Sequence, residues 1–440
     1  MTDAGHTPHE APHKAPRLEN PGIENPGIEN PGIEPPALAP PWLAIVGIGE
    51  DGVEGLGETA RTLLRHAELV IGGARHLSLA AALIAGESKP WPTPLSDAVP
   101  EILARRGRPV AVLTSGDPFC YGAGSLLARH IAPGEWICLP APSATALARA
   151  RLGWSAQDTA LLSLCGRPIE PLAPLLQPGR RILVLSADGT TPATLAAYLD
   201  SRGFGPSRLT VLEALGGPNE RVRAAIAADF VLTEIQPLNL VGIEVLAGPD
   251  AEIIPLSCGL PDTLFENDGQ LTKREIRAMT LSALAPRAGE RLWDVGGGSG
   301  SISIEWMLRH PDNRAIMLEP HAGRAASAAR NACALGVPGL AILGRRAPEG
   351  LRGLPAPDAI FLGGGAGDPE MIPTAWAALR PGGRLVANAV TIDTEIVLAR
   401  AQAELGGTLT RLSVERLEPI GSLQGFKPAR TVTQWAVVKP

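Results

Sequence analysis

From Trp42 onward, short apolar runs alternate with longer segments that have the spacing of helices. Runs such as "LAIVGIG", "PVAVLTSGDP" and "RRILVLSADG" are rich in β-branched residues and leucine, as buried strands are. Segments such as "TARTLLRHA" and "SATALARARLG" repeat apolar residues at the period of an amphipathic helix. Strands that alternate with helices usually pair in parallel within a layered domain. We therefore predict an α/β fold with largely parallel sheets.

The alternation is interrupted over residues 247–270, where proline, glycine and acidic residues replace the periodic pattern. This break predicts two domains, residues 41–250 and residues 251–440, each long enough to bury its own core. The last apolar segments, "TLTRLSVERLE" and "TVTQWAVVKP", are expected to add an edge hairpin to the second parallel sheet.

Residues 1–40 have a different composition, because the unit "ENPGI" occurs three times in succession and bulky apolar residues are rare. Such a segment buries too little surface to offset the entropy lost on ordering, so we predict a disordered tail. His6, His9 and His13 could bind a metal there, but a solvated polar tail is the simpler interpretation.

Composition disfavours several classes of function. No window approaches the roughly 18 uninterrupted apolar residues of a membrane span, and no secretion signal opens the chain, so a cytoplasmic protein without membrane contact is expected. A formal net charge of -6 and an aromatic content of 4% disfavour a nucleic-acid partner, which needs a dense basic surface or stacking platforms. The five cysteines include no C-x-x-C pair, so neither disulfides nor a metal site is predicted.

The stretch "LWDVGGGSGSISIEW", residues 292–306, runs a predicted strand into a glycine-rich turn and then into a helix. Glycines permit unusual backbone angles and let a ligand approach the main chain, while the first amides of the helix face an anionic group. The next predicted strand ends at Glu319, where a carboxylate can accept hydrogen bonds from both hydroxyls of a ribose. The turn alone does not distinguish a dinucleotide from another nucleotide-type ligand.

Three features together resemble the class I S-adenosylmethionine-dependent methyltransferases: D-V-G-x-G-x-G, an acid at the end of the next strand, and P-G-G-R-L before the fifth strand. A dehydrogenase would have glycine where Ser301 stands, so NAD is the weaker alternative. The resemblance covers residues 271–440 and implies a Rossmann-like domain. The implied cofactor contacts are Asp294, Gly296, Gly297, Gly298, Ser299, Gly300, Glu319 and the main chain near Ala347. Thr272 matches a cofactor-contacting threonine of the precorrin methyltransferases, although Thr272 and Glu275 also have the spacing of a capping box.

Four further stretches occur in order in the first domain: "LAIVGIGEDGVEGL", "LTSGDPFCYGAG", "LPAPSATALARARLGW" and "LLSLCGRP". Together they are similar to the tetrapyrrole methylases, class III methyltransferases that hold S-adenosylmethionine in a cleft between two α/β subdomains. The family's contacts carry over to Gly47, Gly49, Ser115, Gly116, Asp117 and Ser143. Asp117 also fits a simple turn-forming Asp-Pro pair, and Cys165 stands where histidine is frequent in the family.

A tetrapyrrole methylase domain followed by a class I domain that opens with "GLPDTLFENDGQLTKREIR" resembles the bifunctional, decarboxylating precorrin methyltransferases of cobalamin biosynthesis. This resemblance implies two S-adenosylmethionine sites, methylation of a precorrin at carbons 5 and 15, decarboxylation of the carbon-12 acetate arm, and a homo-oligomer. It assigns carbon 5 to the first domain, and carbon 15 with decarboxylation to the second. A metal-free precorrin is favoured, and the cobalt-precorrin of the anaerobic route is the alternative.

The implied substrate carries several carboxylates, which guanidinium groups bind better than ammonium groups do. Arg167, Arg345 and Arg346 lie on the motif loops and are candidate carboxylate ligands, with a solvated surface position as the alternative for each. No catalytic acid or base is identified, because methyl transfer from a sulfonium depends mainly on alignment.

Two other classes of function stay open. An RNA or protein methyltransferase is possible on the same folds, but it predicts a basic face that this composition does not favour. A non-enzymatic scaffold predicts degenerate glycine turns, whereas both turns in this sequence are intact.

Overall fold

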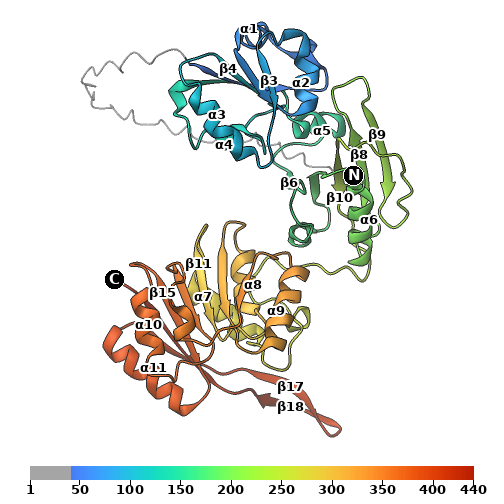
Figure 1. The fold of residues 1–440 in the computed structure, drawn as a ribbon. Coiled ribbons are helices and arrows are strands. Elements are labelled where there is room, and N and C mark those ends of the chain that lie inside the picture. Colours follow the sequence, from blue (N-terminus) through green and yellow to red (C-terminus); the bar gives the residue numbers. More distant parts are fainter. Residues whose placement is uncertain (1–40) are drawn as a thin grey trace, which may run out of the picture.

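The computed structural model describes residues 41–440, and the tail predicted for residues 1–40 lies outside the described residues. The first sheet has five strands, all parallel, in the order β3-β2-β4-β1-β5. Helices α1 and α2 pack on one face of this sheet and α3 and α4 on the other (Figure 1). The bounds are β1 Leu43–Ile48, α1 Glu58–His66, β2 Leu69–Gly72, α2 Ala74–Ala80, β3 Glu87–Pro90, α3 Val99–Ala104, β4 Val110–Ser115, α4 Gly124–Leu127 and β5 Trp136–Leu139. This unit confirms the predicted parallel α/β layer.

The second sheet, in the order β6-β7-β10-β8-β9, departs from the prediction of largely parallel strands. Only β6 and β7 are parallel, and the other three pairings are antiparallel. A parallel connection needs a crossover of about a dozen residues, whereas residues 214–220 alone join β8 to β9, so these strands form a hairpin. The bounds are α5 Ala144–Leu152, β6 Thr159–Ser163, β7 Arg181–Leu185, α6 Thr191–Ser201, β8 Arg208–Glu213, β9 Arg221–Ile226 and β10 Asn239–Glu244.

The third sheet has seven strands in the order β13-β12-β11-β14-β15-β19-β16. Its first five strands are parallel, and β19 and β16 extend the edge in antiparallel fashion. The bounds are α7 Arg274–Leu284, β11 Arg291–Val295, α8 Ser301–Leu308, β12 Arg314–Leu318, α9 Ala322–Ala334, β13 Ala341–Leu343, β14 Ala359–Leu362, α10 Met371–Ala378, β15 Arg384–Ala389, α11 Ile392–Leu405, β16 Thr408–Leu412 and β19 Val432–Val438. The predicted antiparallel edge is therefore confirmed.

The segment "TLTRLSVERLE" does not form one strand. It divides between β16 and β17 (Glu415–Ile420), and β17 pairs with β18 (Leu423–Pro428) as a separate hairpin that projects from the third sheet (Figure 1). All six residues of β17 are exposed, so no core pattern is available to bring this strand onto the sheet.

Neighbouring residues of β11 point to opposite faces of the third sheet. Leu292 packs against α7, α8 and α9, whereas Trp293 packs against α10 and α11. The third sheet is therefore covered on both faces, and its ligand-accessible surface is confined to the strand ends.

The segment between β10 and the 3-10 helix η6 (Asp262–Leu264) joins the two halves. The predicted boundary at residue 250 falls within it and remains a prediction. Ala173 of the 3-10 helix η5 (Glu170–Leu175) belongs to the same buried cluster as the core of the second domain. The other 3-10 helices are η1 Gly52–Gly55, η2 Ala81–Leu83, η3 Leu95–Ala98, η4 Pro133–Glu135 and η7 Glu349–Leu351.

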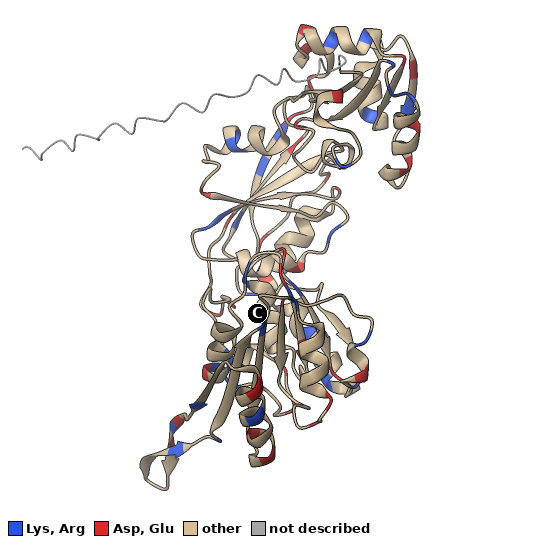
Figure 2. Ribbon diagram, turned by 90° about the vertical axis from the view of Figure 1, so that its left-hand side faces the viewer, with Lys and Arg blue, Asp and Glu red and all other residues tan. Residues whose placement is uncertain are grey.

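Basic and acidic residues are interspersed along the same elements (Figure 2). Among residues 41–440, none of the helices combines the length and the apolarity that a membrane span requires.

Candidate functional site

An open cavity of about 1350 Å³ lies at the carboxyl edge of the third sheet; we call it the second-domain cavity. The ends of β11, β12 and β14 meet there because parallel strands point the same way. Its walls are the glycine turn after β11, the end of β12, the turn after β14 and the segment 269–272 that precedes α7.

The glycine turn after β11 requires glycine for two different reasons. Gly296 and Gly298 have φ of 71° and 57°, which residues with a Cβ rarely adopt. A Cβ on Gly297 would lie 2.3 Å from Cγ of Met317. The backbone of this turn lines the cavity, and α8 begins at Ser301 as predicted.

Glu319 follows β12 and presents its carboxylate to the cavity. Its Oε2 accepts a hydrogen bond from the Gly298 amide at 2.9 Å, and its Oε1 accepts one from the His321 amide at 2.9 Å. A carboxylate has about four acceptor positions, so two backbone amides fix this group and leave acceptor capacity for a ligand.

Asp294 lies fully buried next to the turn. Its Oδ2 accepts hydrogen bonds from the Ser303 amide at 3.2 Å and the Ser303 hydroxyl at 2.7 Å. Its Oδ1 has no hydrogen-bond partner among residues 41–440. Burial, with a smaller contribution from the charge of Glu319, raises the pKa of Asp294 to about 6. Asp294 therefore supports the turn from beneath rather than lining the cavity.

The structure brings most of the predicted second-domain residues together. Those that line the cavity are Thr272, Gly296, Gly297, Gly298, Glu319, Arg345, Arg346 and Ala347. Ser299 is buried, and its carbonyl accepts a hydrogen bond from the Asn331 side chain at 3.0 Å. Gly300 caps α8 with φ of 78°. These two residues, like Asp294, do not line the cavity.

The capping-box interpretation of Thr272 is wrong. The N-cap of α7 is Lys273, which makes no side-chain cap, and the helix begins at Arg274. The Thr272 carbonyl instead accepts a hydrogen bond from Arg277.

Several lining residues are absent from the sequence prediction. Gln270, Met371 and Val390 belong to this group, as do Arg324 and the glycines at 363–365. The glycine triplet in "FLGGGAGDPE" does predict an open carboxyl edge of the sheet at this point, although it does not identify these glycines as cofactor contacts. Arg324 had no such signal, since its position depends on the packing of α9 and on its ion pair with Asp268.

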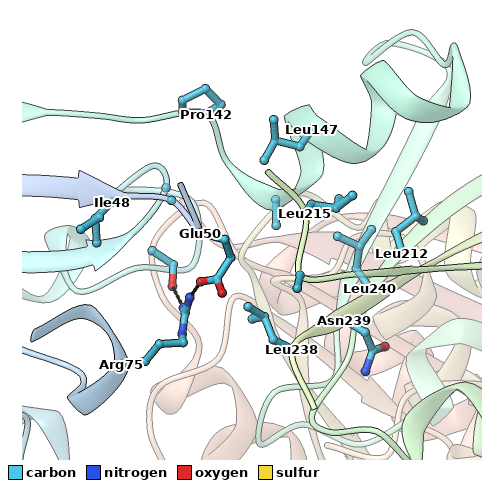
Figure 3. Close-up of a pocket in the computed structure, with 15 residues that line it drawn as sticks. Ile48, Glu50, Arg75, Pro142, Leu147, Leu212, Leu215, Leu238, Asn239 and Leu240 are labelled. Carbon is cyan, nitrogen blue, oxygen red and sulfur yellow. Dashed lines mark hydrogen bonds and ion pairs between the residues drawn. The ribbon is translucent and has the colours of Figure 1, made fainter. Parts of the chain in front are cut away.

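A second cavity, of about 480 Å³, lies between the first and second sheets; we call it the first-domain cavity. Gly49, Ser115 and Gly116 form one side, at the carboxyl ends of β1 and β4. Leucines from α5, from β8 and β10 and from the loops next to these two strands form the opposite side, and Arg75 and Glu50 face them across the space (Figure 3). The leucines are Leu147, Leu212, Leu215, Leu238 and Leu240.

Three other residues predicted for this cavity do not line it. A Cβ on Gly47 would lie 1.7 Å from the Gly116 carbonyl oxygen, so Gly47 permits the close approach of two backbone segments. The Asp117 carboxylate accepts a hydrogen bond from the Phe119 amide at 2.8 Å, which is a turn-forming role. Ser143 caps α5 by accepting a hydrogen bond from the Ala146 amide at 3.2 Å.

Arg75 and His76 are polar residues near this cavity that the sequence analysis does not identify, because "ARHLSLA" has an ordinary helical pattern. Arg75 forms an ion pair with Glu50 and donates a hydrogen bond to the Ser115 hydroxyl at 3.0 Å. The His76 Nε2 lies 2.8 Å from the same hydroxyl. Burial, and next the charge of Arg75, lower the pKa of His76 to about 4, so its imidazole is neutral at pH 7.

Arg167 lies apart from both cavities, in a separate hollow beside Phe119 and Tyr121. Its guanidinium carbon is 5.1 Å from the centroid of the Tyr121 ring, within the range of a cation–π contact. Within residues 41–440, no group of three or more His, Cys, Asp or Glu side chains gathers in a way that could hold a metal ion.

Comparison with known proteins accounts for both halves. Residues 43–230 match the family described as tetrapyrrole (corrin/porphyrin) methylases, and residues 263–439 match the precorrin methyltransferase domain. The chain is 56% identical over 395 residues to precorrin-6Y C(5,15)-methyltransferase (decarboxylating) of Sinorhizobium sp. The matched region covers 90% of this chain and 96% of that protein. The chain belongs to the precorrin-6Y C5,15-methyltransferase (decarboxylating) family.

A second member of this family, from Mycobacterium tuberculosis (strain CDC 1551 / Oshkosh), is 40% identical over 398 residues, or 90% of this chain and 99% of that protein. The crystal structure of the C-terminal domain of precorrin-6Y C5,15-methyltransferase from Rhodobacter capsulatus is 42% identical in sequence. The matched region covers 42% of the present chain and 100% of the Rhodobacter capsulatus domain, with a TM-score of 0.41.

Proposed function

We propose that this chain uses two molecules of S-adenosylmethionine, one in each cavity, to methylate a precorrin at carbons 5 and 15, and that it also decarboxylates the carbon-12 acetate arm. Its family membership supports the reaction. The observation that carries the two-site proposal is the presence of two separate cavities, each beside a glycine turn at the carboxyl edge of a parallel sheet.

The second-domain cavity suits the donor at three points. The backbone of Gly296, Gly297 and Gly298 lines the cavity and gives the methionine end an approach to main-chain groups. The free acceptor positions of Glu319 suit the two ribose hydroxyls. Ala347 lines the same cavity, and we infer that its main chain borders the adenine.

The first-domain cavity suits the same donor by different means. Gly49, Ser115 and Gly116 offer main-chain groups on one side, and the leucine side offers an apolar surface for the adenine ring.

Bound S-adenosylmethionine supplies an electrophilic methyl group on a sulfonium sulfur. The chain itself has mainly to align the acceptor carbon with that methyl and to exclude water, which can account for a large share of the rate enhancement. Meso carbons of a reduced tetrapyrrole are enamine-like nucleophiles. Loss of CO₂ leaves an electron pair that the conjugated imine of the macrocycle accepts, and a proton then completes the methyl group.

The assignment of carbon 15 and of decarboxylation to the second domain, and of carbon 5 to the first, is part of this proposal. Arg345 and Arg346 line the second-domain cavity, where guanidinium groups can bind substrate carboxylates. Arg167 would serve a carboxylate at the hollow beside Tyr121. A metal-free precorrin is the proposed substrate.

We also propose a homo-oligomer that is held in part by the β17–β18 hairpin. Leu417, Ile420, Leu423 and Phe426 on this hairpin have exposed fractions of 53%, 65%, 74% and 69%. A two-stranded hairpin alone is marginally stable in water, so a contact with a second copy would cover this apolar surface. Light scattering should show Phe426→Ser, paired with Leu423→Ser, as a smaller species than the parent chain.

Mass spectrometry of the products tests the proposed reaction. Incubation of the full chain with precorrin-6Y and S-adenosylmethionine should add two methyl groups and remove one CO₂. Calorimetry with S-adenosylhomocysteine should give two equivalents bound. Methyl transfer to bulk RNA in place of the precorrin would favour an RNA methyltransferase. The interspersed basic and acidic residues disfavour that alternative, because RNA binding needs a dense basic surface (Figure 2).

A further inference from the structure

The segment 259–272, which begins at the end of the connection between the two halves and ends at the rim of the second-domain cavity, is held by a buried ion pair. Arg277 on α7 and Glu305 on α8 both have side chains with an exposed fraction of 0%, and the Arg277 Nε lies 2.5 Å from the Glu305 Oε1. Neither residue lines the cavity. The pair therefore has no direct access to a ligand.

The two side chains make hydrogen bonds at both ends of this segment. Glu305 accepts hydrogen bonds from the amides of Gly259 and Leu260, at 2.7 and 2.9 Å. Arg277 donates to the carbonyls of Leu260 and Thr272, and to the Asp262 carboxylate at 3.2 Å. The guanidinium also lies 4.7 Å from the centroid of the Phe265 ring.

This network connects the two walls of the cavity. Glu305 belongs to α8, which follows directly from the glycine turn, while Thr272 belongs to the opposite wall. The walls approach closely, since a Cβ on Gly298 would lie 3.2 Å from the Gln270 carbonyl oxygen. Midway along the segment, Asn331 bonds both Glu266 and the Ser299 carbonyl, which ties the same two walls together again.

A buried ion pair is often no more stabilising than an apolar pair of similar volume. This ion pair instead fixes the geometry of the segment, because the Arg277 guanidinium donates hydrogen bonds to four acceptors on three segments of the chain. We propose that Arg277 and Glu305 are positioning residues, which set the distance between segment 269–272 and the glycine turn and thereby the affinity of the second-domain cavity for its donor. This inference rests on the proposed function of that cavity.

Arg277→Lys in the full chain tests the proposal, because lysine keeps the charge opposite Glu305 but cannot reach all four acceptors. Arg384→Lys is the matched control. Arg384 is also a buried arginine of the same domain, paired with Glu290, bonded to the carbonyls of Leu284 and Ala285, and 5.9 Å from an indole ring. Its position at the start of β15 places it at the sheet edge away from the cavity.

Calorimetry with S-adenosylhomocysteine should show the second site weakened at least tenfold in Arg277→Lys, with the first site unchanged. Arg384→Lys should change the affinity less than twofold at a comparable loss of thermal stability. Equal changes in affinity for the two variants would overturn the proposal, because they would reveal a general effect of stability.

Asp262→Asn provides a second test of the proposal if Arg277→Lys does not fold. Asp262 is 30% exposed, so its replacement weakens one bond of the guanidinium without leaving a buried charge unpaired. A loss of about threefold at the second site supports the proposal, and an unchanged affinity contradicts it. A parent chain that binds no donor in its second cavity would instead refute the proposed function.

Discussion

The two cavities both lie beside glycine turns, but the first glycine of each turn has a different role. In the first domain, Gly47 allows the backbone of the Gly116 loop to cross at a distance where no Cβ fits, and it does not touch the cavity. In the second domain, Gly296 and Gly298 adopt positive φ and themselves form the cavity wall. Gly47 therefore marks close backbone packing, whereas Gly49 and Gly116 line the first-domain cavity as Gly296 and Gly298 line the second.

The walls opposite the turns differ as well. The first-domain cavity faces leucines and carries a paired Arg75–Glu50 ion pair, whereas the second-domain cavity carries the buried Asp294 at its base and the anchored Glu319 in its wall. Apolar contact should thus dominate binding in the first cavity and hydrogen bonding in the second. This contrast can be tested one cavity at a time.

The largest expected effect is at the turn of the second domain. Gly298→Val places a branched side chain beside the Gln270 carbonyl in the cavity wall, so affinity there should fall by more than about 100-fold, or about 3 kcal/mol. The product should keep its carboxyl group and lack the carbon-15 methyl, by mass spectrometry. Gly289→Val, at φ of 78° with nothing within 4 Å of the added Cβ, controls for backbone strain. Carbon-15 methylation that survives Gly298→Val would refute the assignment of this site.

The corresponding change in the first domain is Ala144→Trp. Ala144 is exposed at the start of α5 and lines the cavity, so an indole can occupy the donor's space without entering the core. Binding at the first site should fall by about 10- to 100-fold while the second site stays intact. Ala150→Trp, an exposed position on the same helix outside the cavity, should leave both sites unchanged. Loss of both sites in Ala144→Trp would show that the cavities are not independent.

The second domain was the more predictable of the two from sequence. Its alternation of strands and helices and its glycine turn follow from local periodicity, and Glu319 follows the next strand as predicted. The β17–β18 hairpin was not anticipated, since its residues are exposed and carry no core pattern.

The first-domain cavity was less predictable because its walls come from two sheets. The leucines of β8 and β10 have the pattern of ordinary core residues, and the antiparallel pairing that brings them opposite Gly116 is set by tertiary contacts. Arg75 and His76 were missed for the same reason, since helix α2 has to dock before they approach Ser115. Sequence motifs predict the loops after β1 and β4 that form one side of the cavity, whereas the leucines of the opposite side are identified only in the structure.

Glu319→Gln tests whether hydrogen bonds dominate binding in the second-domain cavity, and its expected loss of affinity is smaller than that of the two preceding variants. A carboxamide nitrogen cannot accept the amide hydrogen of Gly298 or His321, and the lost charge weakens the bonds to a ribose, so affinity should fall about tenfold, or about 1.4 kcal/mol. Glu50→Gln in the first cavity should cost less than about threefold, because Arg75 already engages that carboxylate. Titration calorimetry of both variants, with the exposed Glu349→Gln as control, measures the difference; equal losses would remove the proposed contrast.

The smallest expected effect is a difference in the pH dependence of stability. The pKa of Asp294 is raised to about 6, so the folded second domain binds more protons than the unfolded chain just below that pH, and its stability falls as pH rises. Between about pH 5 and pH 6.5 the change is about 1 kcal/mol, or a melting temperature lower by about 2 to 4 °C. The pKa of His76 is lowered to about 4, so the first domain has the opposite sign and loses stability as pH falls below about 6.5.

Calorimetric melting curves of Asp294→Asn and His76→Gln against the parent chain separate these two contributions. Asparagine can still accept the Ser303 hydrogen bonds, so Asp294→Asn should abolish the downward slope with pH and retain the fold. His76→Gln should abolish the loss of stability on acidification. Asp312→Asn, at a surface carboxyl with an exposed fraction of 73%, should leave both slopes unchanged. If the parent and Asp294→Asn curves ran parallel, the titration of Asp294 would not contribute to the pH dependence of stability, and the predicted difference in sign between the two domains would be wrong.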